Sequence, residues 1–167
     1  VIGRAGMDIY PEPPGTKITD VKDFSTHLGG SAANTCVALS KLGVKSDLVT
    51  CISDDAIGEY ILNKLKDFSV GSGFCRKVDK VYQTQLAVVE TILKNNQSIL
   101  YRNNSCDLQL KKDDIDQINF QDYSAVFISG TALSSNPSRE AIFYATQKAS
   151  TVNLPLIIDL DYRPYNW

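Results

Sequence analysis

Alternation between short apolar segments and amphipathic segments is the feature that most restricts how this chain folds. Short runs bounded by turn residues predict strands over 1–7, 46–52, 74–78, 123–130 and 154–160. Between them, apolar side chains recur at helical spacing over 31–42, 53–68 and 136–150. Strands that alternate with helices favour parallel pairing. We therefore expect an α/β fold with a mostly parallel, Rossmann-like sheet and helices on both of its faces.

The alternation breaks between Val81 and Arg102. The segment “VYQTQLAVVETIL” is too long and too polar on one face for a buried parallel strand, and “KNNQ” is a turn sequence before “SILYR”. This pattern indicates a protruding hairpin. Together with the polar, extended stretch that follows the first strand and contains the proline-rich “YPEPPG”, it predicts a small β lid formed by 8–27 and 81–102.

Length and composition exclude several classes of protein. The chain has 167 residues, 43% of them hydrophobic, which suffices for one domain with a substantial core. Lys and Arg total 17, Asp and Glu total 19, and neither sign forms long runs, so we expect no nucleic-acid partner. No segment approaches the roughly 18 apolar residues of a membrane span, and we expect no leader before the first strand. We expect a cytoplasmic protein with no membrane partner.

The cysteines predict neither a metal site nor disulfides. Cys36, Cys51, Cys75 and Cys106 lie far apart and form no CxxC pair, and the single histidine, His27, has no metal-ligand spacing to any of them. Cysteines in such a pattern are typically small, buried side chains that stay reduced in a reducing compartment. We therefore expect no metal to be bound.

A glycine pair precedes the first helix in “LGGSAANTCVALSKLG”, residues 28–43. A P-loop needs GxxxxGK[ST] and a dinucleotide turn needs GxGxxG directly after a strand, and this segment has neither. Two adjacent residues without side chains allow a ligand to reach backbone N–H groups at a helix start, and Asn34 adds a donor and an acceptor about one turn further on. Taken alone, such a pair is more often a tight turn into a helix.

In its wider context the pair resembles a family signature. “GGSAANTCVALSKLG” is similar to the N-terminal signature of the ribokinase-like (PfkB) sugar kinases, in which a Gly-Gly pair and an Asn help to bind the sugar. “GRAGMDIY”, “ISDDAIGEY”, “SGTALSSNPSREA” and “DLDYRPYNW” extend the similarity over nearly the whole chain, and the long hairpin matches the lid. The sequence departs from the signature at Cys36 and Ser53, neither of which matches a ligand contact.

The resemblance implies a sugar site drawn from several segments. Its hydroxyl end would be formed by Asp8, Gly29, Gly30 and Asn34. By similarity to the sugar-acid kinases of the family, the substrate carboxylate would face Tyr101, Arg102 and Arg163. None of these residues is expected to be catalytic.

Two arguments from the residues themselves agree with an acidic sugar. Asp8 and Arg163 each follow a predicted strand, and ligands of open parallel sheets gather beyond the carboxyl ends of the strands. An arginine binds a planar carboxylate through two parallel charge-assisted bonds, and Arg102 in “LYRN” and Arg163 in “DYRP” are placed to offer one. Two alternatives stay open, with Asp8 as a turn cap and Arg102 as a solvated hairpin residue.

The resemblance also implies that ATP and Mg²⁺ bind outside this segment. In the family, phosphoryl transfer depends on a GAGD motif, an NxxE motif and a nucleotide-binding region that follow the strand matched by “DLDYR”, and none of them occurs in this chain. We therefore expect residues 1–167 to form the N-terminal, substrate-binding part of a kinase. The C-terminal nucleotide-binding part is expected to be absent, and the chain alone inactive.

The resemblance gives the whole protein an expected activity, the ATP-dependent phosphorylation of a six-carbon keto sugar acid. The expected substrate is 5-dehydro-2-deoxygluconate of inositol breakdown, with 2-keto-3-deoxygluconate or a fructose-like sugar as alternatives. A non-catalytic sugar-acid-binding or dimerisation module is an alternative of another class, and the missing GxGxxG disfavours a dinucleotide-binding oxidoreductase. Because the lids of this family often form dimers, we expect a homodimer that pairs through the exposed edge of the β lid.

Overall fold

The first residues of the chain lie in the middle of a parallel sheet in the computed structural model, which describes residues 1–162. Ile2 bridges Val49 on one side and Ile128 on the other, both in parallel. The flanking strands are β3 (Asp47–Ser53) and β4 (Gly71–Val78) on the first side and β7 (Val126–Ser129) and β8 (Leu156–Asp159) on the second. Both of these pairs are parallel, which confirms the predicted pairing in this central sheet.

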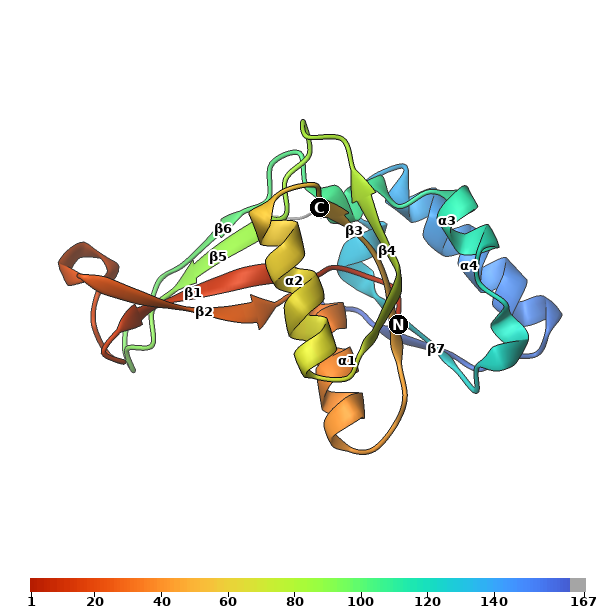
Figure 1. The fold of residues 1–167 in the computed structure, drawn as a ribbon, viewed down its shortest axis with the longest axis horizontal. Coiled ribbons are helices and arrows are strands. Elements are labelled where there is room, and N and C mark those ends of the chain that lie inside the picture. The colour runs from red at the N-terminus through yellow and green to blue at the C-terminus, as the bar shows by residue number, and fades with distance from the viewer. Residues whose placement is uncertain (163–167) are drawn as a thin grey trace.

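Helices cover both faces of the central sheet, as predicted (Figure 1). The helices α1 (Ser31–Lys41) and α2 (Ala56–Asp67) pack on one face, and α3 (Lys112–Asp116) and α4 (Ser138–Thr151) pack on the other. The side chains of β3 alternate between two cores because successive strand residues point to opposite faces. Leu48 and Ile52 join the core beneath α1 and α2, whereas Val49 and Cys51 join the core beneath α4.

A second sheet of four strands extends away from the helices (Figure 1). Its strands, in spatial order, are β2 (Asp23–Gly29), β1 (Gly6–Glu12), β5 (Gln85–Val89) and β6 (Ser98–Tyr101). The outer pairs are antiparallel and the central pair, β1 with β5, is parallel. We call this sheet the lid. All four strands come largely from the two segments for which the sequence predicted a lid, 8–27 and 81–102.

The predicted strand over residues 1–7 is only partly correct. Ile2 alone bridges the central sheet, and the next strand, β1, begins at Gly6 and belongs to the lid. The chain turns out of the central sheet at Gly3, whose φ is 155° and where an added Cβ would lie 2.8 Å from the Cβ atoms of Ala32 and Ser129. This close packing of backbone against α1 and β7 ends the first strand early.

The predicted turn at “YPEPPG” is likewise displaced, because β1 continues through Tyr10 and Pro11 to Glu12. Proline lacks an N–H donor and is disfavoured where a strand is paired on both sides. Pairing of β1 with β5 ends at Ile9, so Pro11 lies where only β2 accompanies β1. The missing donor therefore leaves no ladder bond unmade on the β5 side. As a consequence, Asp8 lies within a strand of the lid. Its position in the sequence predicted instead that it follows a strand of the central sheet.

Residues 103–122 contain structure that the sequence pattern did not predict. They form α3 and two short 3₁₀ helices, Cys106–Gln109 and Phe120–Asp122. Arg76 of β4 holds this region by an ion pair with Asp114 and a 2.7 Å hydrogen bond to the Gln109 carbonyl. Among the helices of the described residues, none is long and apolar enough to cross a lipid bilayer.

Candidate functional site

A cavity of about 540 Å³ lies where the lid meets the start of α1. Asp8 of β1 and Gln85 and Ala87 of β5 contribute one side of its lining, and Gly30 and Asn34 contribute from the beginning of α1. We call it the lid cavity. A hollow of this size accepts a small organic molecule. The structure thus brings Asp8, Gly30 and Asn34, all predicted from the sequence, to one cavity.

The glycine pair is required by its two close neighbours. At Gly29 an added Cβ would overlap the carboxylate of Asp8, so the absent side chain leaves space for that group. Gly30 has a φ of 96°, a conformation that favours glycine, and an added Cβ would lie 2.5 Å from the backbone oxygen of Arg4. Gly29 itself does not line the lid cavity but determines where Asp8 lies. The pair therefore does more than turn the chain into a helix.

Asp8 is partly buried, and its environment changes its ionisation. Burial raises the pKa of the Asp8 carboxyl above its ordinary value, because a charged group loses hydration. The positive charge of Arg4 and a hydrogen bond from Tyr10 offset part of that rise in pKa. His27, which lies opposite Asp8 in the β1–β2 pairing, also lowers the pKa of Asp8.

Arg4 lines the same cavity, and the sequence reasoning missed it. Its side chain is 9% exposed, and its Nη1 donates to Oε1 of buried Gln85 at 3.0 Å. The Arg4 carbonyl accepts a 3.3 Å hydrogen bond from the amide of Ala33, which fixes this backbone against α1. A charged residue in the otherwise apolar run “VIGRAG” was the available signal, because arginine is seldom buried without a partner.

Arg102 lines a second cavity, of about 510 Å³. Ser98 and Leu100 of β6 line both cavities, so the two are neighbours. The Arg102 side chain is 8% exposed, and its Nη2 donates to Asp107 Oδ2 at 2.5 Å and to the Thr131 carbonyl at 3.2 Å. Its Nε is buried without a hydrogen-bond partner among the described residues. Arg102 is therefore an ion-paired, internal residue and not a solvated hairpin residue.

The remaining predicted residues lie elsewhere. Tyr101 is 58% exposed and lines neither cavity. Arg163 lies outside the described residues, so its expected place after β8 stays a prediction. Tyr162, its neighbour in the sequence, does line the lid cavity.

Hydroxyl groups connect the lid cavity with the environment of Arg102. Ser31, at the first turn of α1, lines the lid cavity, and its Oγ lies 2.7 Å from Oγ of Ser129. That oxygen lies 2.9 Å from Oγ1 of Thr131, whose carbonyl accepts the hydrogen bond from Arg102. Ser129 and Thr131 are fully buried, so this chain of hydrogen bonds is shielded from water. It holds the end of β7 against the start of α1.

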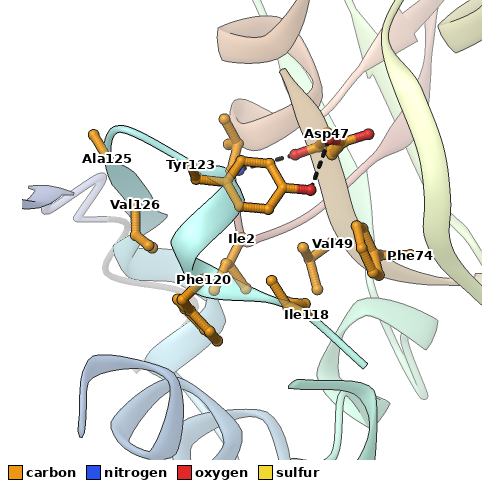
Figure 2. A pocket seen from close by; sticks show the side chains of 10 residues that line it. Ile2, Asp47, Val49, Phe74, Ile118, Phe120, Tyr123, Ala125 and Val126 are labelled. Atoms are coloured by element: carbon orange, nitrogen blue, oxygen red, sulfur yellow. Dashed lines mark hydrogen bonds between the residues drawn. The ribbon is translucent and has the colours of Figure 1, made fainter. Parts of the chain in front are cut away.

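A third cavity lies within the core on the α4 face of the central sheet (Figure 2). It measures about 30 Å³, the volume of roughly one water molecule. Its walls are mostly apolar side chains, and Tyr123 Oη donates to Asp47 Oδ2 at 2.8 Å beside it (Figure 2). A sugar does not fit there. Within residues 1–162, no group of His, Cys, Asp and Glu side chains is arranged to hold a metal ion.

Comparison with known proteins gives one family. The model of the pfkB family carbohydrate kinases matches residues 1–167. A 5-dehydro-2-deoxygluconokinase from Photobacterium profundum is 36% identical over 167 residues, which are 100% of this chain and 50% of that protein. A 5-dehydro-2-deoxygluconokinase from Clostridium perfringens is 37% identical over 99% of this chain and 49% of its own length. The chain thus spans about half the length of the curated relatives that it matches.

Solved structures give the same result at the level of the fold. An uncharacterised sugar kinase from Pyrococcus horikoshii is 27% identical, with a TM-score of 0.86 over 99% of this chain and 56% of that chain. The same kinase in complex with ATP gives a TM-score of 0.85. A 2-dehydro-3-deoxygluconokinase from Thermotoga maritima has a TM-score of 0.87 at 20% identity and therefore supports the fold alone.

Proposed function

This chain belongs to the pfkB family of carbohydrate kinases, and from that membership we propose that it forms the sugar-binding part of an ATP-dependent sugar-acid kinase. The substrate we propose is 5-dehydro-2-deoxygluconate, the sugar acid in the name of the relatives that are 36% and 37% identical. 2-Keto-3-deoxygluconate is the alternative substrate. The observation that carries the proposal is the lid cavity, in which the Asp8 carboxylate lies beside a helix start with no side chains at Gly29 and Gly30.

Each residue of the proposed site has a role that its chemistry allows. The Asp8 carboxylate accepts hydrogen bonds from sugar hydroxyls, and the Asn34 amide both donates and accepts. Gly29 and Gly30 leave space for the ligand and for Asp8 itself. Tyr101, Arg102 and Arg163 remain the proposed contacts of the acid end. Arg102 already binds Asp107, so it would approach a carboxylate only with donors that this ion pair leaves over.

The proposed whole enzyme uses ATP and Mg²⁺, because an ATP complex is known for a relative of 27% identity. The described residues do not form a site that fits ATP with its Mg²⁺ ion. The guanidinium groups of the two cavities, on Arg4 and Arg102, are held by Gln85 and Asp107, and no carboxylate cluster among residues 1–162 is arranged for Mg²⁺. We therefore assign no step of phosphoryl transfer to this segment. It binds and orients the sugar and keeps water from it, and positioning supplies much of the catalysis in such reactions.

Ligand-dependent melting of the chain tests the proposed function. A ligand at about 100 times its dissociation constant adds roughly 2.7 kcal/mol, which raises the melting temperature of a chain of this size by about 5–10 °C. We expect that shift with 5-dehydro-2-deoxygluconate or 2-keto-3-deoxygluconate, and none with Mg-ATP. A cooperative transition without ligand controls for folding. A shift with Mg-ATP and none with either acid contradicts the proposal.

A turnover assay separates the kinase from the second candidate, a non-catalytic sugar-acid-binding module. The observation that favours the module is that no group of three or more His, Cys, Asp and Glu side chains within residues 1–162 could hold a metal ion. We expect the 167-residue chain alone to bind the acid without phosphorylating it. ATP-dependent phosphorylation by the chain alone, above the level of a mock purification, overturns this assignment. Phosphorylation by a longer protein that contains this chain rejects the module.

We also propose that the chain forms a homodimer through the lid. The outer lid strands expose large apolar or aromatic side chains, Phe24 on β2 and Ile99 and Tyr101 on β6. Exposed strand edges with such side chains favour pairing with another chain. Light scattering at high protein concentration should give twice the monomer mass, and a monomeric mass contradicts the proposal.

We also propose a cytoplasmic location for the protein, which fits its four free cysteines.

A further inference from the structure

The two charged residues of the lid cavity have opposite signs. Among the described residues that line it, Arg4 is the one cation and Asp8 is the one anion. Arg4 is 9% exposed and Asp8 is partly buried, so neither charge is fully screened by water. Their attraction offsets part of the rise that burial causes in the pKa of the Asp8 carboxyl.

This arrangement bears on which sugars the cavity accepts. A carboxylate at Asp8 attracts the hydroxyls of any sugar, but it repels the carboxylate of a sugar acid that enters the same cavity. A nearby positive charge removes most of that repulsion. A neutral sugar gains nothing comparable, because it carries no charge to be repelled.

The position of Arg4 is fixed by contacts on its backbone and its side chain. Its carbonyl is bound by the Ala33 amide of α1, and Gly30 leaves the space that this approach needs. Its guanidinium donates to Gln85, which is 3% exposed and itself lines the cavity. Gly6 leaves room for the Gln85 side chain, since an added Cβ would lie 2.5 Å from Gln85 Cγ. The charge is therefore built into the floor of the cavity.

We propose that Arg4, oriented by Gln85, determines the preference of the lid cavity for an anionic sugar over a neutral one. The inference rests on the proposed function and adds a residue to its site. Arg102, a proposed contact of the acid end, adds less to this preference than Arg4, because it lines the neighbouring cavity and Asp107 already balances its charge. Arg4 and Gln85 act as specificity residues, and neither takes part in a chemical step.

The test compares the affinity of the chain for 2-keto-3-deoxygluconate with its affinity for fructose, measured by calorimetry. We expect Arg4→Met to lower the affinity for the acid about tenfold or more and the affinity for fructose by less than about threefold. Arg4→Lys keeps the charge and should retain most of the preference for the acid. Arg76→Met is the matched control, because Arg76 is paired with Asp114 outside the cavity, and it should leave the ratio of the two affinities unchanged.

A second variant keeps the proposal testable if Arg4→Met does not melt cooperatively. Gln85→Glu has the same shape, accepts the same hydrogen bond from Arg4 and adds one negative charge. It should lower the affinity for the acid about tenfold and leave fructose binding nearly unchanged. Unchanged acid binding by Gln85→Glu, or an equal effect of Arg4→Met on both sugars, overturns the inference. If the wild-type chain still binds the acid in that case, the proposed function stands; if it binds neither sugar, both fail.

Discussion

At the scale of single residues, the candidate site depends on what lies next to Gly29 and Gly30. The sequence indicated this pair, Asp8 and Asn34 because their spacing and side chains form a recognisable pattern. It did not indicate Arg4 or Gln85, which contact each other across 81 positions of the chain. No local pattern encodes such a contact, since it exists only after β5 has paired with β1. The sequence indicated Arg102 as a contact of the substrate carboxylate, which stays a prediction, but its ion pair with Asp107 follows from folding of the 103–109 segment.

Replacing Asp8 with Asn tests the hydroxyl end of the site. The amide keeps the shape of the side chain and removes the negative charge, so folding should persist. Binding of a sugar acid should weaken by about tenfold, or 1.4 kcal/mol, because the loss of a charge-assisted hydrogen bond outweighs the relief of a repulsion that Arg4 already removes for the most part. Calorimetric titration measures the loss, and the melting curve of the variant controls for folding. Binding as tight as that of the wild type contradicts the assigned role.

The ionisation of Asp8 gives a pH prediction. Its pKa is raised in the folded chain, so the folded state binds more protons than the unfolded state between the ordinary value of 3.8 and the raised value. Stability contributed by this group therefore falls as the pH rises through that interval. Carboxyl titration by NMR should show a pKa for Asp8 above 3.8, and a higher one still in Arg4→Met because the neighbouring charge is lost. A pKa at or below 3.8 in the wild type contradicts the burial argument.

Arg102→Met should destabilise the chain strongly. The ion pair with Asp107 is buried, with side-chain exposures of 8% and 2%, and removing one partner leaves an uncompensated charge that costs about 3–5 kcal/mol. Urea unfolding measures the difference. Lys77→Met is a suitable control, because Lys77 pairs with Asp54 and Glu59 at the surface and its loss should leave the unfolding midpoint nearly unchanged. Equal losses in the two variants would show that the Arg102 pair is not internal.

At the scale of helices and strands, local periodicity predicted α1, α2, α4 and the strands of the central sheet well. Each has an apolar pattern that can be read within its own segment. The same reasoning placed β1 too early and gave no structure to residues 103–122. Those elements depend on contacts with distant residues, such as Gly3 against Ser129 and Arg76 against Asp114. Pro11 in β1 led the sequence analysis to predict a turn too early. Whether a proline ends a strand depends on where pairing with the neighbouring strand, here β5, ends.

Glu90 makes a prediction about the far end of the lid. Its carboxylate accepts hydrogen bonds of 2.9 Å from the amides of Ile18 and Gln97, which lowers the pKa of Glu90. The stabilisation of the folded chain by the Glu90 carboxylate is complete at pH values above the ordinary pKa of 4.5. It is lost as the pH falls through the lowered pKa of the folded chain. Glu90→Ala should therefore increase proteolytic cleavage within residues 13–22 at neutral pH. Cleavage at the wild-type rate would show that these bonds do not hold the loop.

At the scale of the whole molecule, two cores lie on the two faces of one sheet, and cysteines belong to both. Cys51 and Cys106 lie in the core beneath α4, and Cys36 and Cys75 lie in or against the core beneath α1 and α2. Burial raises the pKa of Cys51, Cys75 and Cys106 to about 12 and also raises that of Cys36. The thiols should therefore react with Ellman's reagent at mildly alkaline pH only as fast as the chain unfolds. Rapid reaction of any of them in the folded chain contradicts the packing of that core.

The central claim is that the lid cavity binds a sugar acid, and an NMR titration of the ¹⁵N-labelled chain with 2-keto-3-deoxygluconate tests it most directly. The account predicts saturable shifts that are largest for the backbone amides of Gly30 and Ser31 and for the side-chain amides of Asn34 and Gln85, all of which line that cavity. Asp8→Asn should weaken these shifts together. Shifts that are largest around Asn103 and Leu108 in the second cavity, or no saturable shifts at all, would contradict the account.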